Sequence, residues 1–267
     1  MMKLAWLELN GCSGNIISLL NGSEPGLEYM ITEMVDLVYD QSLIPCEGER
    51  AMDALFSLLD GEEFILAVEG AIATKDDGKY QIVGKWRGEE ITGVDAVSML
   101  GEKAVHVIAV GACASHGGVS AGTPNPSQSV PVQSILDRTV INLPGCPIHP
   151  DWLVLTVAYI LKNGKAPPLD SLRRPTLVYG KRVHDQCPYR EDDDRCLEDR
   201  GCKGKKTYGD CPVRRWNSGA AKTAGVNWCV ASGSPCQGCT EPGFPDMMSP
   251  FYKEGDDDDS ESSTRTK

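Results

Sequence analysis

The sequence lacks an excess of basic residues, a long apolar run and any internal repeat, and each of these absences narrows the possible functions. It has 26 Lys and Arg against 38 Asp and Glu, which gives a net charge of −12. An acidic chain is poorly suited to nucleic acid, because phosphate binding needs Lys and Arg clustered on one face. No apolar stretch approaches the roughly 20 residues of a membrane-spanning helix. We therefore expect no nucleic-acid partner and no membrane span.

The amino terminus also lacks the features of an export signal. Met1-Met2-Lys3 leads directly into an apolar, strand-like segment, which leaves no room for a cleaved signal peptide or a twin-arginine leader. If this is the native start, we expect a cytoplasmic protein, or a periplasmic one if a leader had been removed. In a reducing cytoplasm the eleven cysteines would act as metal ligands rather than form disulfides.

The first 165 residues alternate between strand-like and helix-like segments. Apolar runs predict strands at 3–9, 35–44, 64–68, 105–110 and 140–143, and helical spacing predicts helices at 25–34, 49–59, 93–100 and 151–161. Residues 75–86 are typical of a polar excursion or hairpin. Strands that alternate with helices imply a parallel sheet covered on both faces. We predict a flavodoxin-like, doubly wound α/β domain over residues 1–165.

Four cysteines come directly after predicted strands. Cys12, Cys46, Cys113 and Cys146 follow the first, second, fourth and fifth strands. Because the carboxyl ends of parallel strands meet at one edge of a sheet, where binding sites form, we expect these thiols at that edge. Glycines beside Cys12, Cys113 and Cys146 would let the backbone approach a bulky inorganic group. Cys46 has no adjacent glycine, and for it a small buried hydrophobe is the favoured interpretation.

The segment after Pro167-Pro168 is rich in cysteine, glycine, proline and charge, and its periodicity is weak. Its core is too thin to fold unaided, and bound metal usually holds such segments together. It carries His184 and seven cysteines: Cys187, Cys196, Cys202, Cys211, Cys229, Cys236 and Cys239. We predict a mostly irregular, metal-stapled domain over 166–255 and a disordered acidic tail over 256–267.

Thiolates at this density suit either zinc or iron–sulfur clusters. Cys236-x-x-Cys239 and His184-x-x-Cys187 each resemble half of a zinc site. The spacings between these pairs do not repeat a zinc-finger or zinc-ribbon pattern, and structural zinc gives no role to the cysteines of the sheet edge. Iron–sulfur clusters are therefore favoured, and structural zinc is the alternative.

Taken together, the two halves resemble the small, electron-transferring subunit of nickel–iron hydrogenases from Trp6 to Tyr252. The matching stretches are Cys12-Ser13-Gly14, Val68-Glu69-Gly70, Gly111-Ala112-Cys113-Ala114, Leu143-Pro144-Gly145-Cys146-Pro147, His184-Asp185-Gln186-Cys187-Pro188, Cys196 to Gly204, Cys211-Pro212, Arg215-Trp216-Asn217, Asn227-Trp228-Cys229 and Pro235 to Pro242. Their order and spacing together make the resemblance specific. It implies three iron–sulfur clusters in a row, and a separate large subunit that carries the nickel–iron centre.

The resemblance also divides the ligands among the clusters. It assigns Cys12, Cys113 and Cys146 to a proximal set nearest the large subunit, His184, Cys187, Cys196 and Cys202 to a distal set, and Cys211, Cys236 and Cys239 to a medial set. Cys229 stands where many relatives have proline, so we add it to the medial set and predict a four-iron medial cluster. The alternative is a three-iron cluster beside a spectator Cys229. The distal cluster is expected to hold four irons.

The proximal loop departs from the family pattern. Many members have a second cysteine where this chain has Asn15, and a glutamate where it has Ile17. The proximal cluster is therefore expected to hold three or four irons, with Asn15, Cys46 or water as candidates for a fourth ligand. Glu69 is expected to face the cluster or the large-subunit interface, without a catalytic role.

On this interpretation the chain transfers electrons and does not itself split dihydrogen. The three sets leave only Cys46 unused, so no cysteine pair remains for a nickel site. Electrons would pass from the proximal to the medial to the distal cluster and leave near His184 to an external carrier. Two alternatives are the small subunit of a regulatory hydrogen sensor and a complex I-related iron–sulfur subunit. The cysteines after residue 184 disfavour the second.

Overall fold

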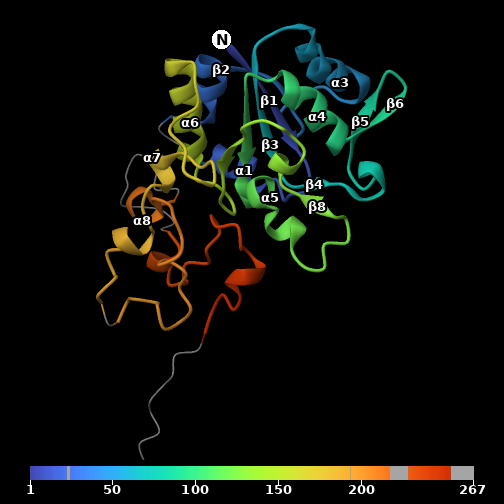
Figure 1. Cartoon of the computed structure of the whole chain (residues 1–267). Coiled ribbons are helices and arrows are strands. Elements are labelled where there is room, and N and C mark those ends of the chain that lie inside the picture. The colour runs from blue at the N-terminus through green and yellow to red at the C-terminus, as the bar shows by residue number, and fades with distance from the viewer. Residues whose placement is uncertain (23–24, 193, 217–227, 254–267) are drawn as a thin grey trace, which may run out of the picture.

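The computed structural model describes residues 1–22, 25–192, 194–216 and 228–253, so the expected acidic tail over 256–267 lies outside the described residues. Figure 1 shows a central sheet flanked by helices, with a less regular carboxyl-terminal segment packed at one end of it. None of the helices in these ranges is both long enough and apolar enough to cross a bilayer.

The central sheet has five strands in the order β2 (Val35–Asp40), β1 (Met2–Glu8), β3 (Phe64–Glu69), β7 (His106–Val110) and β9 (Ile141–Leu143). All four neighbouring pairs are parallel. Counted along the chain, these strands have the order 2-1-3-4-5 of a flavodoxin-like sheet, so the predicted fold is confirmed. Every residue of β3 is buried, because helices cover both faces of the sheet.

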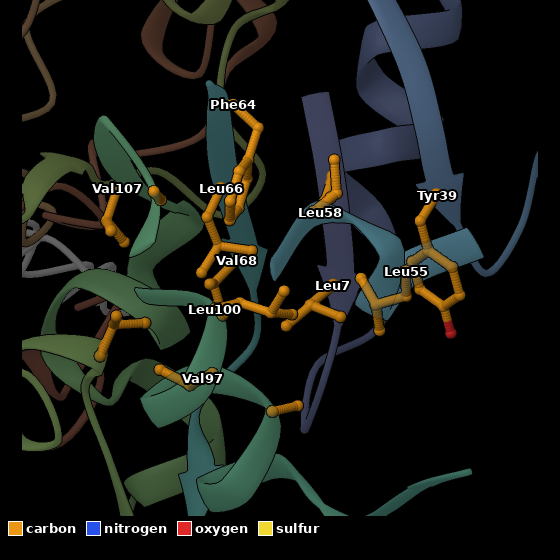
Figure 2. Packing of buried hydrophobic residues seen from close by; sticks show 14 of the residues in the cluster. Leu7, Tyr39, Leu55, Leu58, Phe64, Leu66, Val68, Val97, Leu100 and Val107 are labelled. Carbon is orange, nitrogen blue, oxygen red and sulfur yellow. The ribbon is translucent and has the colours of Figure 1, made fainter. Parts of the chain in front are cut away.

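Two hydrophobic clusters lie on opposite faces of this sheet, because successive residues of a strand point in opposite directions. Leu7 and Leu66 pack with α3 (Gly48–Phe56) and α4 (Gly93–Lys103). Figure 2 shows this cluster, including Leu55 of α3 and Leu100 of α4. The other cluster joins Trp6 and Ile65 to α1 (Gly14–Leu20) and α6 (Pro150–Asn163).

The element boundaries differ from the prediction mainly at turns. The second strand ends at Asp40 rather than at residue 44, because Asp40 Oδ1 accepts the N–H groups of Ser42 and Leu43 and begins a turn. The helix predicted over 25–34 is a short α2 (Leu27–Tyr29) followed by a π-helical turn, Met30–Met34. In the excursion over 75–86, a 3₁₀ turn (Lys75–Gly78) precedes the hairpin of β5 (Ile82–Trp86) and β6 (Glu89–Thr92).

Several short elements were not predicted, because they span too few residues to show a period. They are α5 (Gly111–His116), the antiparallel pair β4 (Ile72–Ala73) and β8 (Ser129–Val130), and 3₁₀ turns at Gly118–Ala121 and Val132–Ser134. The helix predicted over 49–59 ends in another 3₁₀ turn, Ser57–Asp60. Beyond α6 the described chain is mostly irregular, as predicted. It contains α7 (Thr176–Tyr179), α8 (Cys211–Arg214) and 3₁₀ turns at His184–Gln186, Val230–Ser232 and Asp246–Met248.

Candidate metal-cluster sites

The three thiols of the proximal set come together at the carboxyl edge of the sheet, as predicted from their positions after strands. Cys12 follows β1, Cys113 lies in the first turn of α5 after β7, and Cys146 follows β9. Burial, and then the charges of Cys113 and Cys12, raise the pKa of Cys146 to about 11, as expected for thiols in close proximity. Cys12 and Cys146 are exposed residues, so the set lies at the surface of this chain.

The buried Glu69 carboxylate, at the end of β3, binds the loop after Cys12 to the sheet through hydrogen bonds. Glu69, which is 1% exposed, accepts the N–H groups of Asn15 and Ile16 at 2.8 and 3.1 Å and the Asn15 Nδ2 group at 2.9 Å. Trp6 Nε1 donates to it at 3.3 Å. Burial raises the pKa of Glu69 although these hydrogen bonds lower it. Glu69 was expected to face the cluster or the large-subunit interface; in this chain its carboxylate is buried against the start of α1.

The two candidates for a fourth proximal ligand have other contacts. The Asn15 amide donates to Glu69, and its Oδ1 accepts the Ile148 N–H at 2.9 Å. Cys46 packs with the hydrophobic cluster on the α3 face, where its charge contributes to the raised pKa of Tyr39. It is not among the thiols that raise the pKa of Cys146. The structure therefore brings three proximal thiols together and leaves Cys46 outside the group.

The four cysteines of the medial set line one apolar cavity of about 560 Å³. Burial, and then the charges of Cys239, Cys236 and Cys229, raise the pKa of Cys211 well above its usual value. Burial raises the pKa of Cys236 to about 12, and the charges of Cys202 and Cys229 contribute to the rise. The structure thus places Cys229, an exposed residue, on the wall of the same cavity as the other three.

The distal set gathers around the 3₁₀ turn His184–Gln186. His184, Cys187, Cys196 and Cys202 line a common cavity of about 20 Å³. Burial raises the pKa of Cys187, as do the charges of Cys202 and Cys196, whereas the Tyr189 N–H, 3.4 Å from its sulfur, lowers it. This cavity is far smaller than the medial one.

The three sets are connected end to end. Cys146 lines the medial cavity, and its backbone lowers the pKa of Cys239 by hydrogen bonding. At the other end, the Cys236 N–H donates to Cys202 Sγ at 3.3 Å. Trp228, which is 2% exposed, lines both the medial and the distal cavities. One continuous row of thiols therefore runs from the sheet edge to His184.

The residues before and after Cys211 are attached to α6. Trp152 Nε1 donates to Asp210 Oδ1 at 2.7 Å, and Arg214 pairs with the same carboxylate at 2.6 Å. His149, the N-cap of α6, contacts the Arg215 carbonyl through Nε2 at 2.6 Å. Asp210 and Trp152 were not predicted to be part of the site; the only signal in the sequence was the position of Asp210 directly before Cys211.

The donor atoms of the medial set fit an iron–sulfur cluster better than a single ion. All eleven cysteines are free of disulfides, so every thiol is available for metal. Over the residues that the structure describes, no three His, Cys, Asp or Glu side chains converge as they would on one metal ion. Thiols spread around an apolar cavity are suited instead to a polynuclear centre held by cysteine.

Comparisons with known proteins identify the family. Residues 12–160 match the family described as NADH ubiquinone oxidoreductase, 20 Kd subunit, and residues 179–252 match the C-terminal family of the NiFe/NiFeSe hydrogenase small subunit. The chain is 35% identical over 276 residues to the periplasmic [NiFeSe] hydrogenase small subunit of Desulfomicrobium baculatum, which covers 92% of this chain and 85% of the relative. This chain belongs to the hydrogenase small-subunit family. The predicted resemblance is confirmed.

Other relatives agree with this assignment. The hydrogenase-2 small chain of Escherichia coli strain K12 is 36% identical over 258 residues, which cover 90% of this chain and 67% of the relative. A reduced, active NiFeSe hydrogenase from Desulfomicrobium baculatum matches the fold with a TM-score of 0.86 at 35% identity, over 94% of this chain and 98% of that one. The actinobacterial-type NiFe-hydrogenase of Ralstonia eutropha H16 matches with a TM-score of 0.85 at 27% identity, over 96% and 83%.

Membership of this family has direct consequences. This hydrogenase small subunit is part of an oxidoreductase that acts on dihydrogen, and it partners a large subunit that holds the active site. The match over 179–252 disfavours the alternative of a complex I-related subunit. The expected cytoplasmic location is not supported, since three relatives are named periplasmic.

Proposed function

We propose that this hydrogenase small subunit relays electrons between the nickel–iron site of its large subunit and an external carrier through three iron–sulfur clusters. The continuous row of thiols is the observation that carries the proposal: Cys146 lines the medial cavity, and the Cys236 N–H bonds Cys202. Bound clusters would supply one-electron redox centres. The chain itself would hold the clusters at fixed separations and exclude water from them. Its backbone N–H donors and the burial of the sulfurs would adjust the reduction potentials of the clusters.

The proposed ligands are the three sets defined by the sequence. They are Cys12, Cys113 and Cys146 for a proximal cluster of three or four irons; Cys211, Cys229, Cys236 and Cys239 for a medial four-iron cluster; and His184, Cys187, Cys196 and Cys202 for a distal four-iron cluster. The shared cavity of the medial cysteines supports four-thiolate ligation there. We also propose a domain boundary near residue 165, because the helices and strands of the sheet layer end at Asn163.

The proton chemistry of the thiols follows from their burial. Burial raises the pKa values of Cys211, Cys236 and Cys239, so these thiols are protonated at neutral pH before metal binds. Only the thiolate is a ligand, and cluster insertion therefore releases these protons. The buried, negatively charged sulfurs would then be stabilised by iron and by N–H donors such as that of Cys236.

Anaerobic purification of the chain with its large subunit tests the proposal. We expect about 12 or 13 irons per heterodimer, one of them from the nickel–iron site of the large subunit, and about 12 acid-labile sulfides, since two clusters would hold four irons and one three or four. Dihydrogen should reduce all the clusters in electron paramagnetic resonance titrations. A Cys202→Ser variant should impair reduction of an external dye more than reduction of the proximal cluster. Zinc in place of iron and sulfide would refute the proposal.

A further inference from the structure

Among the Lys and Arg residues that the structure describes, Arg174 is the only one that is buried, at 3% exposure. The neighbouring Arg173 is exposed. A buried cation is strongly destabilising unless it is paired and hydrogen-bonded. Arg174 has both kinds of partner: Nε donates to Asp170 Oδ2 at 2.8 Å, and Nη1 donates to Glu241 Oε1 at 2.9 Å and to the Thr240 carbonyl at 3.1 Å.

These contacts join the segments that carry two medial cysteines. Thr240 and Glu241 directly follow Cys239. Glu241 Oε1 also accepts the Tyr208 N–H at 2.7 Å, and Thr240 Oγ1 donates to the Tyr208 carbonyl at 2.7 Å. Tyr208 lies three residues before Cys211. One guanidinium therefore connects the loop after α6 to the chain on both sides of the medial cavity.

Arg174 is also connected to the medial set through a buried tyrosine. Tyr179 is buried, and the Arg174 guanidinium lies 5.4 Å from the centre of its ring. Tyr179 belongs to the hydrophobic cluster against which Cys211 packs. One buried cluster therefore connects the arginine to a medial cysteine. Charges interact strongly across such a site, because little water screens them.

We propose that Arg174, paired with Glu241, is a positioning residue for the medial set, and that the pair sets the electric field at the centre those cysteines hold. This inference rests on the proposed function, which supplies a redox centre at this place. An arginine suits the role because its planar fork donates to several acceptors at once. A lysine would keep the charge but would lose part of this geometry.

The sign of each substitution's effect follows from the charge that the substitution removes. Reduction adds negative charge to the centre, so a nearby cation favours the reduced form and a nearby anion disfavours it. Arg174→Gln should therefore shift the medial centre toward oxidation, and Glu241→Gln should shift it toward reduction. Loss of loop structure alone would not give shifts of opposite sign.

The experiment uses the complete complex with the large subunit, purified anaerobically. Arg174→Gln, Arg174→Lys and Glu241→Gln are compared with wild type, and Arg173→Gln is the matched control because it alters an adjacent, exposed arginine. Iron and sulfide are counted first, and the medial centre is then titrated by electron paramagnetic resonance. We expect Arg174→Gln and Glu241→Gln to change the medial reduction equilibrium about tenfold in opposite directions, or about 59 mV each. Arg173→Gln should stay within about twofold of wild type, because solvent screens its charge.

Arg174→Lys separates geometry from charge. It should leave the medial equilibrium near the wild-type value and increase the rate at which a chelator removes iron. Shifts of the same sign in Arg174→Gln and Glu241→Gln, or an equal shift in Arg173→Gln, would overturn the inference. If the Arg174→Gln complex does not assemble, the other two variants decide. An unchanged medial reduction equilibrium in Glu241→Gln, together with a wild-type rate of iron loss in Arg174→Lys, would overturn the inference. Wild-type complex without iron would instead refute the proposed function.

Discussion

Asp40, at the end of β2, has a charge that opposes folding. The residue is 0% exposed, and its Oδ2 has no hydrogen-bond partner among the described residues. Oδ1 accepts the N–H groups of Ser42 and Leu43. Burial raises the pKa of Asp40 from 3.8 to about 6, although these two hydrogen bonds lower it. Asp40→Asn keeps an acceptor for the turn and removes the buried charge.

The pKa shift sets the size of the effect. A rise from 3.8 to about 6 corresponds to about 3 kcal/mol against folding once the carboxyl is ionised in both states, at about 1.36 kcal/mol per pH unit. The folded state binds more protons than the unfolded state between these two pKa values. The free energy of unfolding therefore falls as pH rises through this window and levels off above it. At pH 5 only about 1.6 kcal/mol of the penalty has developed.

Asp40→Asn should consequently be more stable than wild type, and the difference should grow by about 1.4 kcal/mol between pH 5 and pH 7.5. Scanning calorimetry of the anaerobic complex at both pH values measures this as a gap in Tm that widens by roughly 3–6 °C. Asp36→Asn, at an exposed position on the same strand, is the matched control and should show a gap that does not vary with pH. A constant gap for Asp40→Asn, or a variant less stable than wild type at pH 7.5, would refute the reasoning.

Three further predictions concern the candidate sites. Cys229→Ser should lower the iron content by about one atom and give the medial site a three-iron resonance signal, because one thiolate is lost; an unchanged medial spectrum would make Cys229 a spectator. Cys46→Ser should leave the iron content and the rate of dihydrogen oxidation unchanged, since Cys46 packs on the α3 face; a loss of proximal iron would make it the fourth ligand. Gly111→Ala should reduce stability more than Gly88→Ala, as measured by Tm. Both glycines have φ near 89°, which costs a side chain about 1–2 kcal/mol, but a Cβ on Gly111 would also lie 2.4 Å from the Asn15 amide, whereas one on Gly88 meets no described atom within 4 Å. Equal losses in the two variants would contradict the close contact.

The fold was predictable wherever the chain repeats a simple pattern. β3 and β7 are continuous apolar runs, and their burial on both faces follows from that composition. The gathering of Cys12, Cys113 and Cys146 was predictable too, because the carboxyl ends of parallel strands meet at one edge. In both cases a local pattern was enough for the prediction: a run of apolar residues for the strands, and a cysteine just after a strand for the proximal set.

The remaining contacts depend on residues far apart in the chain and leave no local signal. The Asn15 side chain was a candidate ligand, but it bonds Glu69, 54 positions away, and that contact is visible only once β1 and β3 are aligned. Arg173 and Arg174 are identical in type, yet only Arg174 is buried, because Glu241 and Asp170 converge on it. The glycines beside the proximal cysteines were predicted to admit an inorganic group. At Gly111 the close neighbour is instead the Asn15 amide.

The way this chain builds its row of thiols explains why the two halves depend on each other. The proximal thiols lie on a sheet with two large hydrophobic clusters. Among the described residues, the buried cores beside the distal and medial thiols are small: one consists of Val183, Trp228, Val230 and Cys236, and the other of Ala112, Phe244 and Met248. Cores this small give little stability by themselves, and the segment must be held by metal and by contacts with α6 such as Trp152 to Asp210. Cys146 is the point at which the halves meet, since it ends the β9 connection and lines the medial cavity. The sheet fixes the position of Cys146. That position therefore limits how close the medial thiols of the irregular segment can lie to the proximal thiols.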